Sequence, residues 1–288
     1  MNPKICIILN PAAKGERARR FVRTLKREFP DVHLMLTRAP GHALNLAREA
    51  SDKGFETIVA AGGDGTLNEV VNGMALSKSK LGIMPIGSVN VFAMELGIPR
   101  EVDKAVEILR KHHTRKIDLA RANNRWFVQL SGVGFDAEIV KSTDLNLKKA
   151  LGPLSYAVTV SQLAGKKPAT IHLRNGKKSH KKDGAFVLIG NGRLYGGPFA
   201  VFPDADLEDG LLDVCLFEKI SHMDVLRYIQ GIILGRHINM EDVHYFKADK
   251  IVISSENNEV PVEVDGELSG NTPVEFEVVT KGLEVIVP

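Results

Sequence analysis

Apolar and polar residues follow two different periods along the first 115 residues of this chain. Short, nearly continuous apolar runs are typical of buried strands, and they occur at residues 5–9, 33–36, 57–60 and 81–86. Between and after these runs, apolar residues recur every three or four positions, as on one helix face, in segments that include Phe21, Leu44, Leu67 and Val102. Strands that alternate with helices predict a mainly parallel sheet covered on both faces, a three-layer α/β/α domain at residues 1–116.

The pattern changes near Ile117, after which short strand patterns predominate. They occur at residues 126–130, 170–173, 185–189, 211–217, 250–253, 260–264, 274–279 and 283–287. The turns between them are rich in Gly, Asn and Asp, which is typical of antiparallel sheets. We therefore expect an all-β sandwich domain at residues 117–288, whose last strand can return to the first domain.

Two helical patterns interrupt these strands, at residues 151–164 and 223–234. The second has an apolar stripe along one face that consists of Val225, Leu226, Ile229, Ile232 and Ile233. We interpret this stripe as core packing, and the alternative is contact with lipid.

The formal net charge of +3 is too small to indicate nucleic acid as the main partner. Basic residues are nevertheless concentrated in the middle of the chain, most densely at Lys177, Lys178, Lys181 and Lys182. We expect a solvated loop at this cluster. The alternative is attraction to an anionic membrane surface, at about 1 kcal/mol per basic residue.

The two cysteines, Cys6 and Cys215, lie in apolar strand-like runs. Buried free thiols suit a reducing compartment better than a disulfide does. The N-terminus lacks a signal-peptide pattern, and no apolar stretch approaches the roughly 20 residues that a membrane-spanning helix needs. We expect a cytoplasmic protein that is at most peripheral at the inner membrane surface.

A glycine-rich turn at Gly62-Gly63-Asp64-Gly65-Thr66 carries the strongest chemical signal. It follows a predicted strand and precedes a predicted helix, so its backbone amides can face an anion. The charge of Asp64 would repel a phosphate unless Mg²⁺ bridges them, or unless the carboxylate handles an attacking hydroxyl. The turn therefore favours nucleotide phosphate binding over its alternative, a tight turn with a capping aspartate.

Four further segments place polar or flexible residues where strands end. They are Asn10-Pro11, the stretch 85–93 with Gly87 and Ser88, the stretch 190–213, and Asp265-Gly266-Glu267. The first two follow predicted parallel strands, whose carboxyl ends meet at the edge where ligands bind. The closely spaced acids of residues 204–213 can bind a hard cation, although Asp-Gly is also an ordinary turn pair.

Taken in order along the chain, these segments resemble the lipid kinase family that includes diacylglycerol kinases, sphingosine kinases and bacterial soluble lipid kinases. The resemblance spans nearly the whole chain, from Asn10 to Glu267 and beyond. The family's second block commonly has an acid where this chain has Val91, so a role borrowed for that position does not carry over. The glycine turn alone also fits NAD kinases.

The resemblance implies a set of site residues. The residues expected to hold ATP are Asn10, Thr37, Gly62, Gly63, Gly65, Thr66, Asn68, Glu69, Gly87, Ser88 and Asn90. Asp136 is expected to orient the acceptor hydroxyl, with Glu267 as proton acceptor, although Asp64 and Glu267 can exchange roles. A structural Mg²⁺ is expected at the side chain of Asp209 and the backbone carbonyls of Asp206 and Leu211.

The resemblance therefore implies ATP-dependent phosphorylation of a lipid hydroxyl, as in diacylglycerol, phosphatidylglycerol or a sphingoid base. The expected cofactors are ATP and Mg²⁺, and the partners are a lipid substrate and an anionic membrane, with a homodimer among the expected states and no nucleic acid. Two alternatives stay open, namely an NAD kinase-like enzyme and a nucleotide-binding regulator without transferase activity.

Overall fold

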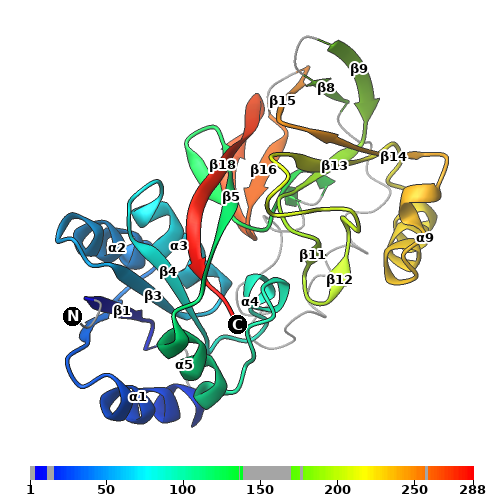
Figure 1. Cartoon of the computed structure of the whole chain (residues 1–288). Helices are drawn as coiled ribbons and strands as arrows, with labels where there is room; N and C mark the ends of the chain where they lie inside the picture. The colour runs from blue at the N-terminus through cyan, green and yellow to red at the C-terminus, as the bar shows by residue number, and fades with distance from the viewer. Residues whose placement is uncertain (1–3, 12–15, 136, 139–169, 176–177, 257–258) are drawn as a thin grey trace. The chain divides into compact units, whose positions relative to one another are not determined.

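The computed structural model describes residues 4–11, 16–135, 137–138, 170–175, 178–256 and 259–288 (Figure 1). The chain divides into two compact units. The first consists of Met1–Leu119 and Thr280–Pro288, and the second of Ala120–Val279. The division falls within two long strands, β5 (Thr114–Ala122) and β18 (Val274–Ile286), so each of them belongs partly to both units.

The first unit is built on a parallel sheet with the strand order β2-β1-β3-β4. These strands are β1 (Ile5–Leu9), β2 (His33–Leu36), β3 (Thr57–Gly62) and β4 (Lys80–Pro85). The helices are α1 (Glu16–Glu28), α2 (His42–Asp52), α3 (Asp64–Met74), α4 (Val91–Glu95) and α5 (Val102–Lys111). The end of β18 extends the sheet beside β4, where Val285 pairs with Leu81.

Helices cover both faces of this sheet, as Figure 1 shows. Helices α2 and α3 pack together, and α1 packs against α5. The contact between α2 and α3 is close because α2 buries only small residues and α3 has a glycine, Gly73, at the crossing. A side chain on Gly73 would lie 2.2 Å from the carbonyl oxygen of Leu44. The three-layer α/β/α arrangement predicted from the sequence is confirmed.

The second unit contains two mainly antiparallel sheets, as predicted. One has the order β14-β13-β10-β7-β16-β17, and the other continues from β18 through β15 and β8 to β9. The first sheet consists of β7 (Leu130–Gly134), β10 (Phe186–Gly190), β13 (Leu212–Phe217), β14 (Val243–Ala248), β16 (Pro261–Val264) and β17 (Glu267–Asn271). The other strands are β6 (Arg125–Phe127), β8 (Ile171–Asn175), β9 (Lys178–Gly184) and β15 (Lys250–Ser255).

Strands β10 and β13 are buried along their whole length, which explains why their sequences are almost continuously apolar. One face contributes Val187 and Val214 to a core shared with the other sheet. The opposite face carries Phe186 and Phe217, whose rings stack 4.4 Å apart beneath helix α9 (His222–Ile233). The short strands β11 (Leu194–Tyr195) and β12 (Phe199–Ala200) pair with each other beside this region.

Several element predictions need correction. The predicted strand at 126–130 is divided into β6 and β7, because backbone amides between them bond to the carboxylate of Asp265 instead of to a neighbouring strand. The predicted strands at 274–279 and 283–287 are one continuous strand, β18. Strands β5 and β14 were not anticipated, because their mixed polar sequences give no clear period.

The lysine cluster and the helix at 223–234 also differ from expectation. Lys178, Lys181 and Lys182 belong to strand β9 and not to a loop, whereas Lys177 and the predicted helix at 151–164 lie outside the described residues. Helix α9 is present, but the predicted stripe does not form one buried face. Val225 is buried, whereas Leu226, Ile229 and Ile233 are exposed. No helix among the described residues is long and apolar enough to cross a membrane.

Candidate functional site

The strand order of the first unit determines where a ligand can bind. Strands β1 and β3 are neighbours in the sheet. After β1 the chain continues to β2, toward one edge of the sheet, and after β3 it continues to β4, toward the opposite edge. Adjacent loops that depart in opposite directions open a crevice at the carboxyl ends of the strands. Asn10 follows β1, and the glycine turn follows β3, so both sequence-predicted segments lie at this point.

Two glycine turns touch at this edge. Gly63 precedes helix α3, and Gly87 follows β4. A Cβ atom on Gly87 would lie 2.4 Å from the Cα atom of Gly63, so only glycine allows the two backbones to come this close. The first amides of α3 have no helical partner and can bind an anion at the same place.

Asp64 links these two turns through its carboxylate. Its Oδ2 accepts the backbone amide of Asn90 at 2.9 Å, and its Oδ1 accepts that of Val91 at 2.7 Å. The carboxylate therefore satisfies amides at the start of α4 and complements the helix dipole. Burial raises the pKa of Asp64, and these hydrogen bonds oppose that effect. The capping role considered for Asp64 is real, but it serves α4 and not its own helix.

Other predicted residues are brought together around the glycine turn. The amide of Asn10 donates to the hydroxyl of Thr66 at 3.1 Å, which ties the end of β1 to the start of α3. The backbone amide of Thr37 bonds to the carbonyl of Leu9, so the loop after β2 lies beside the loop after β1. Ser88 is exposed in the second turn, whereas Asn68 is buried.

Glu69 reaches from α3 to the start of α2. Its Oε1 accepts the backbone amide of Gly41 at 2.7 Å, and its Oε2 accepts that of Ala43 at 2.9 Å. Both carboxylate oxygens thus cap α2, a position for which the sequence offered no local capping residue. A surface hollow of about 430 Å³ begins here, lined by Arg38, Ala39, Pro40, Gly41, His42 and Asn45.

Sequence reasoning missed two cationic residues near these loops. Arg38 lines the hollow beside the predicted Thr37. Arg100 donates to the carbonyl of Gly87 at 3.2 Å and to that of Ser88 at 2.7 Å, which fixes the second turn. The local sequence does not mark either arginine as a site residue. Each can be recognised only from the folded structure, which brings a loop of the site next to it.

Glu267 lies in the second unit, at the start of β17. Its side chain is 45% exposed, and Arg125 donates to its Oε2 at 2.5 Å. The preceding turn is rigid because the carboxylate of Asp265 accepts the backbone amides of Val128, Gln129 and Leu130, each at 3.1 Å. Glu267 is therefore an exposed carboxylate held in place by an arginine. Asp136, the predicted acceptor-orienting residue, lies outside the described residues.

The predicted metal-binding residues share one turn of the second unit. The Oδ1 of Asp209 accepts the amide of Leu211 at 2.9 Å, and the amide of Asp209 approaches the carbonyl of Asp206 at 3.5 Å. The Oδ2 of Asp209 accepts the ammonium of Lys247 at 2.6 Å. Carboxylate and carbonyl oxygens are chemically suited to Mg²⁺, but here an ammonium already neutralises Asp209.

Lys247 also serves a buried carboxylate in this turn. Its Nζ lies 3.6 Å from the Oδ2 of Asp213. The side chain of Asp213 is almost fully buried, and its other oxygen, Oδ1, accepts the hydroxyl of Tyr245. Burial raises the pKa of Asp213. Burial alone would lower the pKa of Lys247, but its contacts with the two aspartates raise it. Among the described residues, no group of three or more His, Cys, Asp or Glu side chains is placed to hold a metal.

Comparisons with known proteins cover both units. Residues 4–122 match the family model described as the diacylglycerol kinase catalytic domain. Residues 130–287 match the model described as the YegS C-terminal NAD kinase beta sandwich-like domain.

Relatives and solved structures of similar length also match. The chain is 30% identical over 290 residues to a diacylglycerol kinase of Bacillus subtilis (strain 168), covering 98% of this chain and 95% of the relative. It is 33% identical over 296 residues to a diacylglycerol kinase of Staphylococcus haemolyticus, covering 98% and 87%. A crystal structure of a diacylglycerol kinase from Bacillus anthracis str. Sterne is similar with a TM-score of 0.82 and 27% identity, covering 99% and 97%. The chain therefore belongs to the diacylglycerol kinase family and is a phosphotransferase with a lipid kinase catalytic domain.

Proposed function

We propose that this protein transfers the γ-phosphoryl group of ATP to a lipid hydroxyl, with diacylglycerol as the first candidate acceptor. The observation that carries the proposal is the contact between the turns of Gly63 and Gly87, braced by Asp64, at the carboxyl edge of the parallel sheet. Such an edge binds phosphate groups through backbone amides. Relatives that span the chain bear the name diacylglycerol kinase, which supports that acceptor.

The first unit supplies the proposed nucleotide contacts. The amides at the start of α3 and the hydroxyl of Thr66 are the proposed phosphate contacts, with Asn10 holding that hydroxyl in place. The hollow beside Thr37 offers room for another part of the nucleotide, and Arg38 on its rim adds a positive charge. Mg²⁺ bound with the nucleotide would neutralise charge that develops on the transferred group.

Two carboxylates have different proposed roles, one in taking the acceptor proton and one in positioning the glycine turns. Glu267 is the proposed proton acceptor, because its side chain is partly exposed and Arg125 holds it in one orientation. Asp64 already accepts two amides, so its main proposed role is to position the turns. Mg²⁺ is proposed to compete with Lys247 for the carboxylate of Asp209.

The test is phosphate transfer from labelled ATP onto diacylglycerol, phosphatidylglycerol, sphingosine and ceramide in detergent micelles. We expect transfer to one of these lipids that requires Mg²⁺ and is lost in Glu267→Gln. The matched control is Glu275→Gln, because Glu275 is 44% exposed and also pairs with a cation, Lys250, at 2.7 Å. Failure of every lipid to accept phosphate, with ATP still bound, contradicts the proposal.

NAD is the second candidate acceptor. The family model that matches residues 130–287 is described as NAD kinase beta sandwich-like, which favours including NAD as a water-soluble acceptor in the same assay. Transfer to NAD alone would replace the lipid in the proposal. Binding of ATP without transfer to any acceptor would favour a nucleotide-binding regulator.

A further inference from the structure

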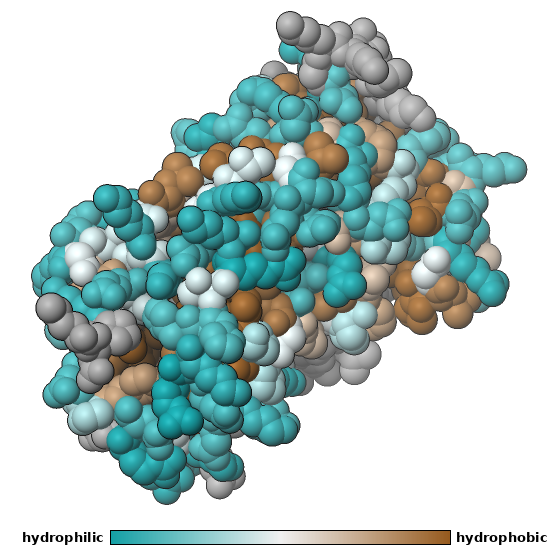
Figure 2. Space-filling view, in the orientation of Figure 1, coloured by the Kyte–Doolittle hydropathy of each residue, from teal (hydrophilic) through white to brown (hydrophobic). Residues whose placement is uncertain are grey.

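Helix α9 exposes a row of large apolar side chains, which we call the outer face. Their exposed fractions are 74% for Met223, 60% for Leu226, 40% for Ile229, 60% for Ile233 and 55% for Leu234. Single exposed apolar residues are ordinary, but a group on one helix marks an interaction site. Figure 2 shows hydrophobic atoms gathered at the surface over the position of α9.

The outer face is held outward by tight packing on the opposite side of the helix. The ring of Tyr228 lies 4.8 Å from that of Phe217, and Val225 is buried in the same cluster. A Cβ atom on Gly231 would lie 2.3 Å from the side chain of Met240, so the helix backbone is pressed against the underlying chain. The orientation of α9 therefore does not allow it to turn its outer face inward.

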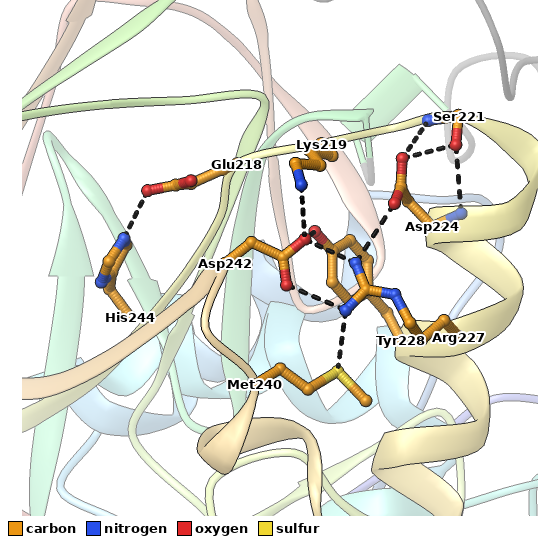
Figure 3. A network of polar contacts seen from close by, with 9 residues as sticks. All are labelled: Glu218, Lys219, Ser221, Asp224, Arg227, Tyr228, Met240, Asp242 and His244. Carbon is orange, nitrogen blue, oxygen red and sulfur yellow. Dashed lines mark hydrogen bonds and ion pairs between the residues drawn. The ribbon is translucent and has the colours of Figure 1, made fainter.

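A polar network anchors the same helix (Figure 3). Arg227 donates to Asp242 at 3.0 Å and to Asp224 at 3.1 Å, while the hydroxyl of Tyr228 donates to Asp242 at 2.9 Å. Ser221 caps the helix through a reciprocal contact with Asp224. Asp224 and Asp242 are thereby paired with Arg227, and the exposed Lys219 also lies 3.7 Å from Asp242. The outer face itself contains no charged residue.

A basic residue is exposed at each end of the outer face. Lys219 and His222 are exposed at the first end of α9, and Arg236 is exposed just beyond the other end. Of the nearby exposed acids, Glu218 accepts the ring nitrogen of His244 at 2.6 Å on the neighbouring strands, and Glu241 follows the turn after the helix. Cations at both ends of an uncharged apolar face suit an anionic lipid surface.

The size of the outer face argues against a second copy of the chain. From Met223 to Leu234 a helix rises about 16 Å, and it is about 10 Å wide. A stable interface needs about 800 Å² from each partner, which this face alone does not approach. A twofold contact through α9 would also bring the cations at the ends of the two helices together. A bilayer requires no matching surface and accepts a short in-plane helix.

We infer that the outer face of α9 docks on an anionic lipid bilayer, with its apolar side chains in the boundary between headgroups and acyl chains. The inference rests in part on the proposed function, because a lipid acceptor is delivered from such a bilayer. It adds a membrane-binding surface that is separate in the chain from the residues proposed to hold ATP. Lys219 and Arg236 contact the headgroups at either end.

The test is co-sedimentation of the whole, nucleotide-free protein with vesicles of phosphatidylcholine alone or of phosphatidylcholine mixed with phosphatidylglycerol. We expect Leu226→Gln/Ile233→Gln to reduce the partition coefficient for the mixed vesicles at least tenfold. Lys219→Gln/Arg236→Gln should reduce it about tenfold for the mixed vesicles only. The matched control is Leu76→Gln, since Leu76 is 57% exposed in the first unit.

Three results would overturn the inference. They are undiminished binding by the apolar double variant, equal binding of the wild-type protein to neutral and anionic vesicles, and a wild-type dimer that the same variant makes monomeric. If that variant does not fold, Met223→Gln/Leu234→Gln at the two ends of the outer face takes its place. Transfer to a short-chain, water-soluble diacylglycerol separates the two proposals, because the variants should retain it. If the wild-type protein does not transfer phosphate to this soluble diacylglycerol, the result counts against the proposed function and not against the membrane surface.

Discussion

Asp64 braces the proposed phosphate site with a single carboxylate. The aspartate side chain is suited to this because each oxygen accepts one amide of the α4 start, Asn90 on one side and Val91 on the other. An asparagine can accept at only one of these positions and would direct its amide hydrogens at the other. At the residue scale, the geometry of the two turns therefore depends both on the negative charge of Asp64 and on its having two acceptor oxygens.

Asp64→Asn should lower the free energy of unfolding by about 1–3 kcal/mol, because one buried amide loses its acceptor. It should also raise the KM for ATP as the two glycine turns separate. Thermal unfolding and steady-state kinetics measure the two effects, with the exposed Asp52→Asn as control. A variant with wild-type stability and only kcat reduced would show that Asp64 does not position the turns.

Glu267→Gln should lower kcat and leave the KM for ATP and the stability almost unchanged, in contrast to Asp64→Asn. Loss of a positioned base lowers kcat by roughly 10²–10⁴-fold while the KM for ATP stays close to its wild-type value. Its contact with Arg125 is on the surface, so stability should change by less than about 1 kcal/mol. Kinetics beside the Glu275→Gln control provide the measurement, and an unchanged kcat would remove Glu267 from the mechanism.

Elements are anchored by residues distant in sequence, and the pairing of α9 with Asp242 is the clearest case. The bonds from Arg227, together with that from Tyr228, hold the pKa of Asp242 well below its usual value, although burial acts in the opposite direction. A carboxyl group with a lowered pKa stabilises the fold above its unfolded pKa of about 3.9, and this contribution is lost as the pH falls toward the folded value.

Asp242→Asn should therefore destabilise the protein by about 2 kcal/mol at pH 7, because charged hydrogen bonds to Arg227 are lost. The difference from the wild-type protein should shrink as the pH falls below about 4, because the aspartate of the unfolded chain then takes up a proton while that of the folded chain is still ionised. Denaturant unfolding at several pH values measures it. A constant difference across that range would mean that the ion pair does not carry the effect.

The turn of Asp209 makes a second prediction at the scale of elements. Lys247→Met leaves Asp209 and the buried Asp213 without their cation, so the free energy of unfolding should fall by about 3 kcal/mol. Millimolar Mg²⁺ should restore part of this loss, and more than it adds to the wild-type protein, because an oxygen of Asp209 becomes free. Melting temperatures of the wild-type protein and of Lys247→Met, each measured in EDTA and in Mg²⁺, give the two Mg²⁺ effects. Lys250→Met is the control for loss of an exposed lysine. Equal Mg²⁺ effects on both proteins would exclude competition.

At the scale of the whole molecule, nucleotide binding should involve only part of the chain. Mg²⁺ and ATP at about 100 times Kd should raise the free energy of unfolding by about 2.7 kcal/mol if ATP binds only the folded state. Hydrogen exchange should slow in the loops that contain Asn10, Thr37, Gly63 and Gly87, while amides of α9 exchange as before. Protection confined to the second unit would contradict the proposed site.

Much of the fold was predictable because strand and helix periods are local. The strands predicted at residues 5–9 and 57–60 are read from continuous apolar runs, and the glycine turn from its own residues. Strand β14 escaped prediction because its burial depends on β13 beside it. The bracing of Asp64 and the capping by Glu69 could not be predicted, since their partners lie 26 to 28 residues away in the chain.

The sequence by itself determined the alternation of elements, the position of the glycine-rich turn and the resemblance to lipid kinases, because each depends on neighbouring residues or on motif order. Only the tertiary structure decided which apolar face of α9 is buried, and which oxygens of Asp64, Glu69 and Asp209 are already occupied. The physical reason is that the spacing of apolar residues shows which positions favour burial, but it does not show which part of the folded chain will cover them. Both faces of α9 are apolar, and the aromatic side chains beneath it cover only one.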